Sequence, residues 1–260
     1  MNIENFVIGM KKNQFLFEEL VKRDFKKKYK RTILGFLWSM VSPLCMLGVL
    51  VFVFSHFFGR QIQYYPLYIL SGQIVFSYFS EATNTGMVAL FNNASIFSKI
   101  NVPKYLFVLS RNISACINFL LTVGIFFAFV FSYGIELNWK MLLIVYPVIC
   151  LIIFNYGVGL LLSALYIFFK DLQYLYSLFL QLMMYGSAIF YGIDILPSSM
   201  QFIFYLNPLY VYITCIRSVV IYNTLPEFTI TLLCIGYAVL AILLGYYVYK
   251  KYNYKFIYYI

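Results

Sequence analysis

Long stretches without Lys, Arg, Asp or Glu divide this 260-residue sequence into candidate membrane spans. The charge-free runs cover residues 32–59, 112–135, 141–169, 172–193, 195–216 and 228–249, and they consist mainly of apolar residues. A helix needs about 20 predominantly apolar residues to cross the hydrocarbon core of a bilayer. Because the runs reach that length, the sequence predicts an all-α integral membrane protein.

Basic residues give these runs an orientation, since Lys and Arg gather on the cytoplasmic side of short loops. A dense group precedes the first run: Lys11, Lys12, Lys22, Arg23, Lys26, Lys27, Lys28, Lys30 and Arg31. Segment 1–31 is therefore expected in the cytoplasm, and it is too charged for the apolar core of a secretory signal peptide. Spans are expected at 33–57, 66–90, 104–133, 140–168, 172–193 and 228–249, the first kinked or tilted by Pro43.

The run 195–216 is predicted not to be a full span. Counting it as one would carry Lys250, Lys251 and Lys255 to the outside, against the charge rule. The region also contains an Asn207-Pro208 pair, which is awkward in a lipid-facing helix. Two short re-entrant helices within 197–223, shielded by protein or water, resolve both problems. The predicted fold is a single domain, 1–260, with six spans and both termini cytoplasmic.

The segment before the first span has the pattern of an amphipathic helix. Phe17, Val21, Phe25 and Tyr29 recur every four residues and so share one helix face. Lys and Arg occupy much of the remaining surface, which is typical of a helix in the headgroup layer. Two interpretations stay open: a charge cluster that only sets topology, and a helix that also docks a cytoplasmic partner.

Composition and motifs argue against catalysis by this chain. It is 63% hydrophobic and 11% charged with a net charge of +10. In a membrane protein an excess of basic residues is first explained by the orientation of the spans, so no nucleic-acid partner is expected. No GxxxxGK[ST] phosphate-binding loop occurs, and His56 is the only histidine, which excludes a histidine-based metal cluster. The five cysteines form no CxxC pair and are interpreted as packing residues.

Four ionisable residues fall near membrane depth: Glu81, Arg111, Asp194 and Arg217. Such residues are functional candidates by default, because a charge in the membrane is costly. For Glu81 and Arg111 the favoured interpretation is a structural polar contact near a helix end. A proton-coupled carrier would usually offer more intramembrane acids or histidines.

Four stretches resemble a known family in order and spacing. They read LVKRDFKKKYKRTILGFLWSMVSP, NNASIFSKINVPKYLFVLSRN, FKDLQYL and YLNPLYVYITCIRSVVI. Over nearly its whole length the chain resembles membrane subunits of ABC-2 type exporters, closest to the branch exporting O-antigen, capsule or teichoic-acid polymers. The resemblance implies a homodimer in the bacterial plasma (inner) membrane, joined to two copies of a separate ATP-binding subunit. That partner would use ATP and Mg, and no cofactor is expected on this chain.

The resemblance also implies two regions that rest on the ATP-binding partner and convert its closure into helix movement. One is an interface helix, here about residues 15–30, and the other is a coupling helix at 92–102. The expected partner-interface residues are Phe17, Val21, Phe25, Lys26, Lys27, Asn93, Ile96, Phe97 and Lys99.

The implied substrate is a polysaccharide attached to a polyprenyl diphosphate lipid, its diphosphate drawn to basic residues near the cytoplasmic entrance. Asn207, Pro208 and Arg217 match the family's pattern at the external mouth of the path. Aromatic residues make up 22% of the chain, and Tyr suits both the C–H faces and the hydroxyls of sugars. The expected path residues are Tyr78, Tyr185, Tyr191, Tyr205, Asn207, Tyr210 and Arg217.

Two other functions remain open. One is an ABC-2 exporter of a drug, a peptide or a small lipid. The other is a polyprenyl-handling membrane enzyme or an ion-coupled carrier. The enzyme predicts acidic or histidine motifs in cytoplasmic loops, but the loops here are short and nearly free of acids.

Overall fold

Helices form every regular element in the residues that the computed structural model describes, which are 12–30, 32–59, 62–136 and 138–259. The α-helices are α2 (Gln14–Tyr29), α3 (Trp38–Phe58), α4 (Tyr65–Met87), α5 (Ala89–Asn92), α6 (Ala94–Phe97), α7 (Tyr105–Ser132), α8 (Val145–Phe168), α9 (Leu172–Gly186), α10 (Ser198–Tyr205), α11 (Pro208–Val220), α12 (Phe228–Tyr252) and α13 (Phe256–Tyr259). Short 3-10 helices cover Gly35–Leu37, Trp139–Ile144 and Ile193–Ile195. The predicted all-α class is confirmed.

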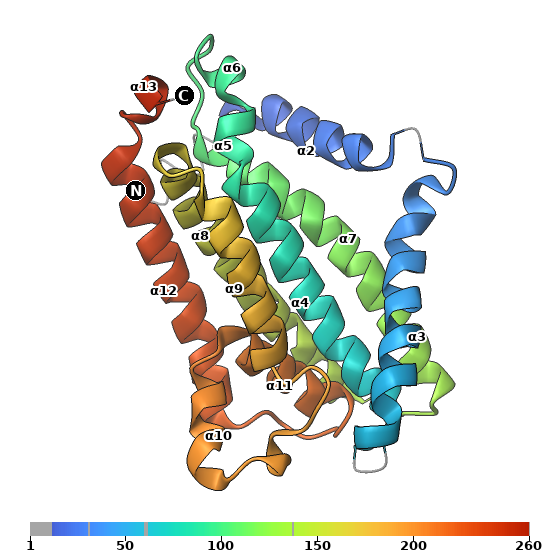
Figure 1. Ribbon diagram of the computed structural model, residues 1–260. Coiled ribbons are helices and arrows are strands. Elements are labelled where there is room, and N and C mark those ends of the chain that lie inside the picture. Colours follow the sequence, from blue (N-terminus) through green and yellow to red (C-terminus); the bar gives the residue numbers. More distant parts are fainter. Residues whose placement is uncertain (1–11, 31, 60–61, 137, 260) are drawn as a thin grey trace.

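The long helices α3, α4, α7, α8, α9 and α12 run between two ends of one bundle (Figure 1). Helix α2 lies across one end of the bundle, where α5, α6 and α13 also lie, and this is called the α2 end. Helices α10 and α11 lie at the opposite end, called the α11 end. The chain therefore places its basic amphipathic helix and its bent helix pair at opposite ends of the bundle.

In the described residues, four helices are individually long and apolar enough to cross a membrane: Gly35–Phe58, Tyr105–Ser132, Trp139–Phe168 and Phe228–Tyr252. The pair α10 and α11, bent by 99°, is a fifth candidate if it counts as one broken span. Helix α4 does not qualify by composition, because it carries Ser, Thr, Gln, Asn and Glu side chains. It lies inside the bundle against α3, α7, α8 and α11, where most of its residues are buried. Helix α9 has 15 residues and is too short on its own.

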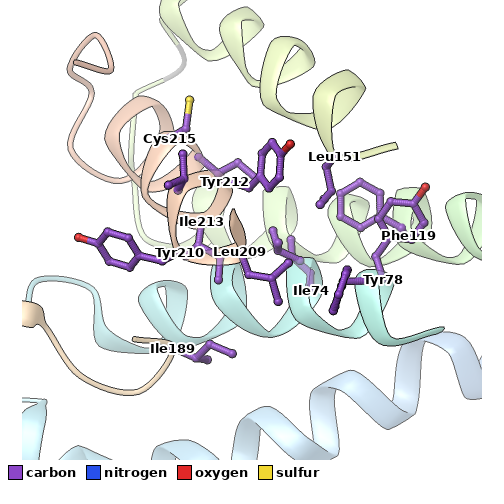
Figure 2. Packing of buried hydrophobic residues seen from close by; sticks show 14 of the residues in the cluster. Ile74, Tyr78, Phe119, Leu151, Ile189, Leu209, Tyr210, Tyr212, Ile213 and Cys215 are labelled. Atoms are coloured by element: carbon purple, nitrogen blue, oxygen red, sulfur yellow. The ribbon is translucent and has the colours of Figure 1, made fainter. Parts of the chain in front are cut away.

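The largest buried cluster joins α4 to α7, α8 and α11. In Figure 2 the α11 side chain of Leu209 lies beside Ile74 of α4. The rings of Tyr78 and Phe119 stack at 4.7 Å between α4 and α7. Helix α11 is capped at its start by Asn207, whose side chain accepts a hydrogen bond from the Leu209 amide. This packing fixes α11 against the middle of the bundle.

Two glycine contacts let the helices approach closely. A Cβ at Gly157 of α8 would lie 2.5 Å from the backbone carbon of Ala241 in α12. A Cβ at Gly86 of α4 would lie 3.3 Å from the Cα of Gly159 in α8. Small residues allow this backbone approach between membrane helices, where packing drives association.

Several helix boundaries differ from the sequence-based expectations. Instead of one coupling helix at 92–102, the chain forms the two one-turn helices α5 and α6. The buried Asn93 lies between them, and its side chain donates to the Ala89 carbonyl. The helix expected at 66–90 ends at Met87, and the one expected at 172–193 ends at Gly186. After Gly186, side chains from α4 and α11 donate hydrogen bonds to the backbone carbonyls that a continuing helix would have used.

Candidate functional site

Helix α2 is attached to the bundle through a buried acid. Asp24 is only 4% exposed and faces α7. It accepts hydrogen bonds from Arg23, at 2.8 Å, and from the Ser110 hydroxyl, at 3.2 Å. Nε of Arg111 lies 3.2 Å from Oδ2, the carboxylate oxygen that also accepts from Ser110. A buried carboxylate persists only when it is paired in this way, so Asp24 ties α2 to α7.

The end of α2 makes a second polar attachment. Lys28 Nζ lies 2.7 Å from Oε1 of Glu81 on α4. The same oxygen accepts a hydrogen bond from the Asn118 amide of α7, at 2.9 Å. The Tyr29 hydroxyl donates to the Asn118 carbonyl oxygen at 2.7 Å. One network therefore joins α2, α4 and α7, in agreement with the structural role expected for Glu81.

This network borders a cavity of about 440 Å³, called the α2–α4 cavity, which is lined by α2, α3, α4 and α7. Its wall includes Lys28, Glu81, Tyr78 and Gln73. A neighbouring cavity of about 390 Å³ adds Lys27 and Arg111. Among the charged wall residues, Lys28 and Arg111 already face carboxylates. The space is polar, but much of its positive charge is neutralised within the chain.

The expected partner-interface residues fall into three groups. The apolar stripe of α2, which contains Phe17, Val21 and Phe25, is half-buried on the side that packs along α7. Lys26, Lys27 and Lys99 are exposed at the α2 end, and Ile96 is half-buried. Asn93 and Phe97 are buried within the chain itself. The lysines are thus the members best placed for a partner outside this chain.

The exposed face of α2 also carries internal ion pairs. Lys22 donates to the Glu19 carboxylate at 3.0 Å, and this hydrogen bond raises the pKa of Lys22. The pair is spaced three residues apart and solvent-exposed, so water screens it and it contributes little to helix stability. In the described part of the chain, no carboxylate lies within 4.0 Å of the Lys26 or Lys27 ammonium.

At the α11 end, Arg217 joins three segments. It is 3% exposed and donates hydrogen bonds to the Ser71 hydroxyl at 3.1 Å and to the Tyr68 carbonyl at 3.0 Å. It also donates to the carbonyls of Ala188 and Ile189, at 3.0 and 3.2 Å. Its guanidinium carbon lies 3.3 Å from the centroid of the Tyr68 ring. Arg217 therefore holds the segment after α9 against both α4 and α11.

The expected path residues do not share one cavity in the single chain. Tyr78 is buried, donates to the Asn112 side chain at 2.7 Å and lines the α2–α4 cavity. Tyr210 and Arg217 line a separate cavity of about 300 Å³ at the α11 end. Asn207 borders an apolar cavity of about 380 Å³.

The other three tyrosines lie near the segment after α9. Tyr185 is exposed on α9, and its carbonyl accepts from the Tyr191 hydroxyl at 2.7 Å. The Tyr205 carbonyl accepts from the Tyr237 hydroxyl at 2.7 Å. Their role in a substrate path stays a prediction.

Sequence reasoning missed the polar residues that organise these contacts. Asp24 falls three residues after Val21, on the apolar face of α2, and an acid at that place is the signal that could have found it. Asn112 and Asn118 stand out as amides within an apolar helix, but their partners on α4 and α2 cannot be read from α7 alone. Among the residues described, no group of three or more His, Cys, Asp or Glu side chains could hold a metal ion.

Comparison with known proteins gives this arrangement a family. Residues 16–221 match the ABC-2 type transporter family. An O-antigen export system permease protein RfbA of Klebsiella pneumoniae is 30% identical over 257 residues, which cover 96% of this chain and 98% of the relative. An RfbA protein of Myxococcus xanthus is 25% identical over 82% of each chain. The polysialic acid transport protein KpsM of Escherichia coli is 23% identical over 88% of this chain and 94% of its own. The resemblance in the sequence is confirmed, and this chain belongs to the ABC-2 type transporter family.

Proposed function

We propose that this chain is the transmembrane subunit of an ATP-driven exporter that moves a polysaccharide linked to polyprenyl diphosphate across the bacterial plasma membrane. The observation that carries the proposal is the full-length similarity to O-antigen export permeases, at 30% identity. The similarity to a polysialic acid transport protein supports a polysaccharide cargo as well. O-antigen, capsule and teichoic-acid polymers are the candidate cargoes.

The proposed topology has six spans with the α2 end in the cytoplasm. Helix α4 crosses inside the bundle, and α9 crosses together with the extended segment that follows it. The charge distribution supports this orientation, because basic side chains concentrate at the α2 end. Those in the described residues are Lys12, Lys22, Arg23, Lys26, Lys27, Lys28, Lys30, Lys99, Lys104, Arg111, Lys170, Lys250, Lys251 and Lys255. Helices α10 and α11 then form the re-entrant pair on the external side.

Energy comes from a separate ATP-binding subunit, which binds ATP and Mg, while this chain pairs with a second copy of itself. The sequence has no GxxxxGK[ST] loop of its own. The exposed lysines of α2, together with Lys99, supply a docking surface for the two ATP-binding subunits. Helix α3 leaves most of its apolar side chains exposed in the single chain, and this surface supports pairing with another membrane subunit.

Docking through α2 is tested by reversing Lys26 and Lys27 to Glu. The ATP-binding subunit should no longer co-purify, because both side chains are exposed and neither pairs with a carboxylate in the described residues. The matched control is Lys251→Glu, which changes an exposed lysine on α12 instead. Equal loss of the partner in both variants would indicate a general charge effect and reject docking through α2.

The function itself is tested by depleting the chain in its native host. Polyprenyl-linked glycans are then extracted and surface polysaccharide is assayed. The expected result is lipid-linked polymer accumulating inside while the surface polymer disappears. Unchanged glycan on both sides would reject a polysaccharide cargo and leave an ABC-2 exporter of a drug, a peptide or a small lipid.

A further inference from the structure

The largest cavity described in the chain, about 690 Å³, lies at the α2 end away from the α2–α4 cavity. It is lined by the start of α2, by the loop between α6 and α7, and by the last turns of α12. Its volume is within the range of about 300–1,000 Å³ found for ligand sites. Among the described residues, the lining contains Lys12, Lys104 and Lys250, several tyrosines, and no Asp or Glu.

The lysine at the base of this cavity is buried without a charged partner. Lys104 is 9% exposed, and its ammonium donates to the backbone carbonyl of Asn253 at 2.7 Å. Two rings lie near it, Phe97 at 5.4 Å and Phe256 at 5.6 Å from Nζ to the centroids. Within the described residues no carboxylate lies within 4.0 Å of it. A buried charge without a counter-ion is costly, so an anion in this cavity would be strongly favoured.

The contrast with the α2–α4 cavity decides which basic site is available to an anion. There Lys28 lies 2.7 Å from Glu81, and Arg111 lies 3.2 Å from Asp24. In the 690 Å³ cavity the exposed Lys12 and Lys250 have no carboxylate within 4.0 Å in the part of the chain that is described. The unneutralised positive charge therefore lies beside α12.

An apolar stripe leads from this cavity along α12. Ile235, Val239 and Leu243 follow one another every four residues and are 46%, 46% and 60% exposed. Tyr246 continues the same face three residues later, and Lys250 four residues after that, where both line the cavity. A ligand that fits both parts has an anionic head and a hydrocarbon tail.

We infer that this cavity binds the phosphate headgroup of an anionic phospholipid, with an acyl chain lying along the exposed stripe of α12. Lys104 forms the base of the site, and Lys12 and Lys250 flank the phosphate. Tyrosines at this depth suit the boundary between headgroups and acyl chains. The bound lipid would offset the charge of Lys104 and fasten the end of α12 to the loop before α7. This inference does not depend on the identity of the exported cargo.

The test uses the full chain, with its ATP-binding partner, in nanodiscs of phosphatidylglycerol and phosphatidylcholine, and counts retained lipids by native mass spectrometry. The double variant Lys12→Gln/Lys250→Gln alters only exposed side chains. Each lysine near an anionic lipid surface changes affinity about fivefold, so phosphatidylglycerol retention should fall about 25-fold. The control Lys251→Gln removes the neighbouring exposed lysine, which points to another face of α12, and should retain the lipid. A second variant, Lys104→Gln, should also lose it.

Other results would overturn the inference. Equal losses in the double variant and in Lys251→Gln would indicate general surface attraction. Equal retention of phosphatidylcholine would remove the role of the anionic charge. Displacement by millimolar inorganic phosphate would indicate an anion site without a lipid requirement. Preference for a polyprenyl diphosphate over phosphatidylglycerol would make the cavity a substrate site. Retention of the lipid by the chain alone in the same nanodiscs, but not by the complex with the ATP-binding subunit, would make it a surface for an acidic segment of that partner.

Discussion

Replacing Arg217 with Met separates a structural role from a role in the substrate path. The guanidinium makes four hydrogen bonds that join α4, α11 and the segment after α9. At the lower end of about 1.5–3 kcal/mol for a bond to a charged group, four bonds contribute about 6 kcal/mol. Part of this loss is offset in the variant, because the neutral Met avoids the several kcal/mol that desolvation of a buried ion costs. The net loss expected from these two terms is about 3 kcal/mol.

Thermal unfolding of the purified protein in nanodiscs measures this loss. For a chain of about this size, 1 kcal/mol lowers the apparent Tm by about 2–4 °C, so Arg217→Met should lower it by roughly 6–12 °C. Hydrogen exchange should rise in residues 187–192, because that segment loses the hydrogen bonds that Arg217 of α11 donates to its Ala188 and Ile189 carbonyls. Arg217→Lys keeps the charge but lacks the planar fork, and an intermediate loss is expected.

The matched control is Lys140→Met at the same end of the bundle. Among the described residues, Lys140 makes one hydrogen bond, to the Asn223 carbonyl at 3.0 Å, so the expected loss is at most about 1.5 kcal/mol. An Arg217→Met protein with the wild-type Tm and unchanged hydrogen exchange, but without export, would refute the structural argument. That result would assign Arg217 to the substrate path.

Three further changes test the packing and the attachment of α2. Gly157→Val should prevent stable folding, because its Cβ would lie 2.5 Å from the α12 backbone. The control Gly236→Ala has open space around it and should leave the Tm unchanged or raise it. Folding is followed by size-exclusion chromatography. Asp24→Asn should raise protease cleavage of α2, since Arg111 loses its buried carboxylate, and wild-type resistance would argue against that attachment. Lys28→Glu should lower the Tm by facing Glu81, and adding Glu81→Lys should restore it; failure of the swap would show that the pair does not contribute to stability.

The sequence pattern predicted the helices well where the cause is local. The four-residue repeat before the first span corresponds to α2, and charge-free runs correspond to α3, α7, α8 and α12. The pair Asn207 and Pro208 marks the bend between α10 and α11, because Asn caps a helix and Pro suits its first turn. The membrane class and the family resemblance followed from the same local signals.

The end of α9 could not be predicted because its cause is distant in the sequence. The run to residue 193 is free of charge, so a helix pattern continues through it. In the fold, the Tyr65 hydroxyl donates to the Phe190 carbonyl and the Tyr68 hydroxyl to the Tyr191 carbonyl, across 125 and 123 residues. These donors satisfy carbonyls that would otherwise require helical amides. The charge-free run itself contains no information about these distant tyrosine donors.

The same distance limits what a sequence can say about its charges. Lys28 and Lys104 count equally in the rule that orients the chain, because that rule depends on the number of basic residues near each span. In the fold, Lys28 is paired with Glu81, 53 residues away, while Lys104 is buried against a backbone carbonyl 149 residues away. Pairing reduces the field that a lysine presents to a ligand, whereas burial without an acid increases it. The basic excess therefore predicts an orientation for the chain, but only the folded contacts indicate which lysines can bind an anion.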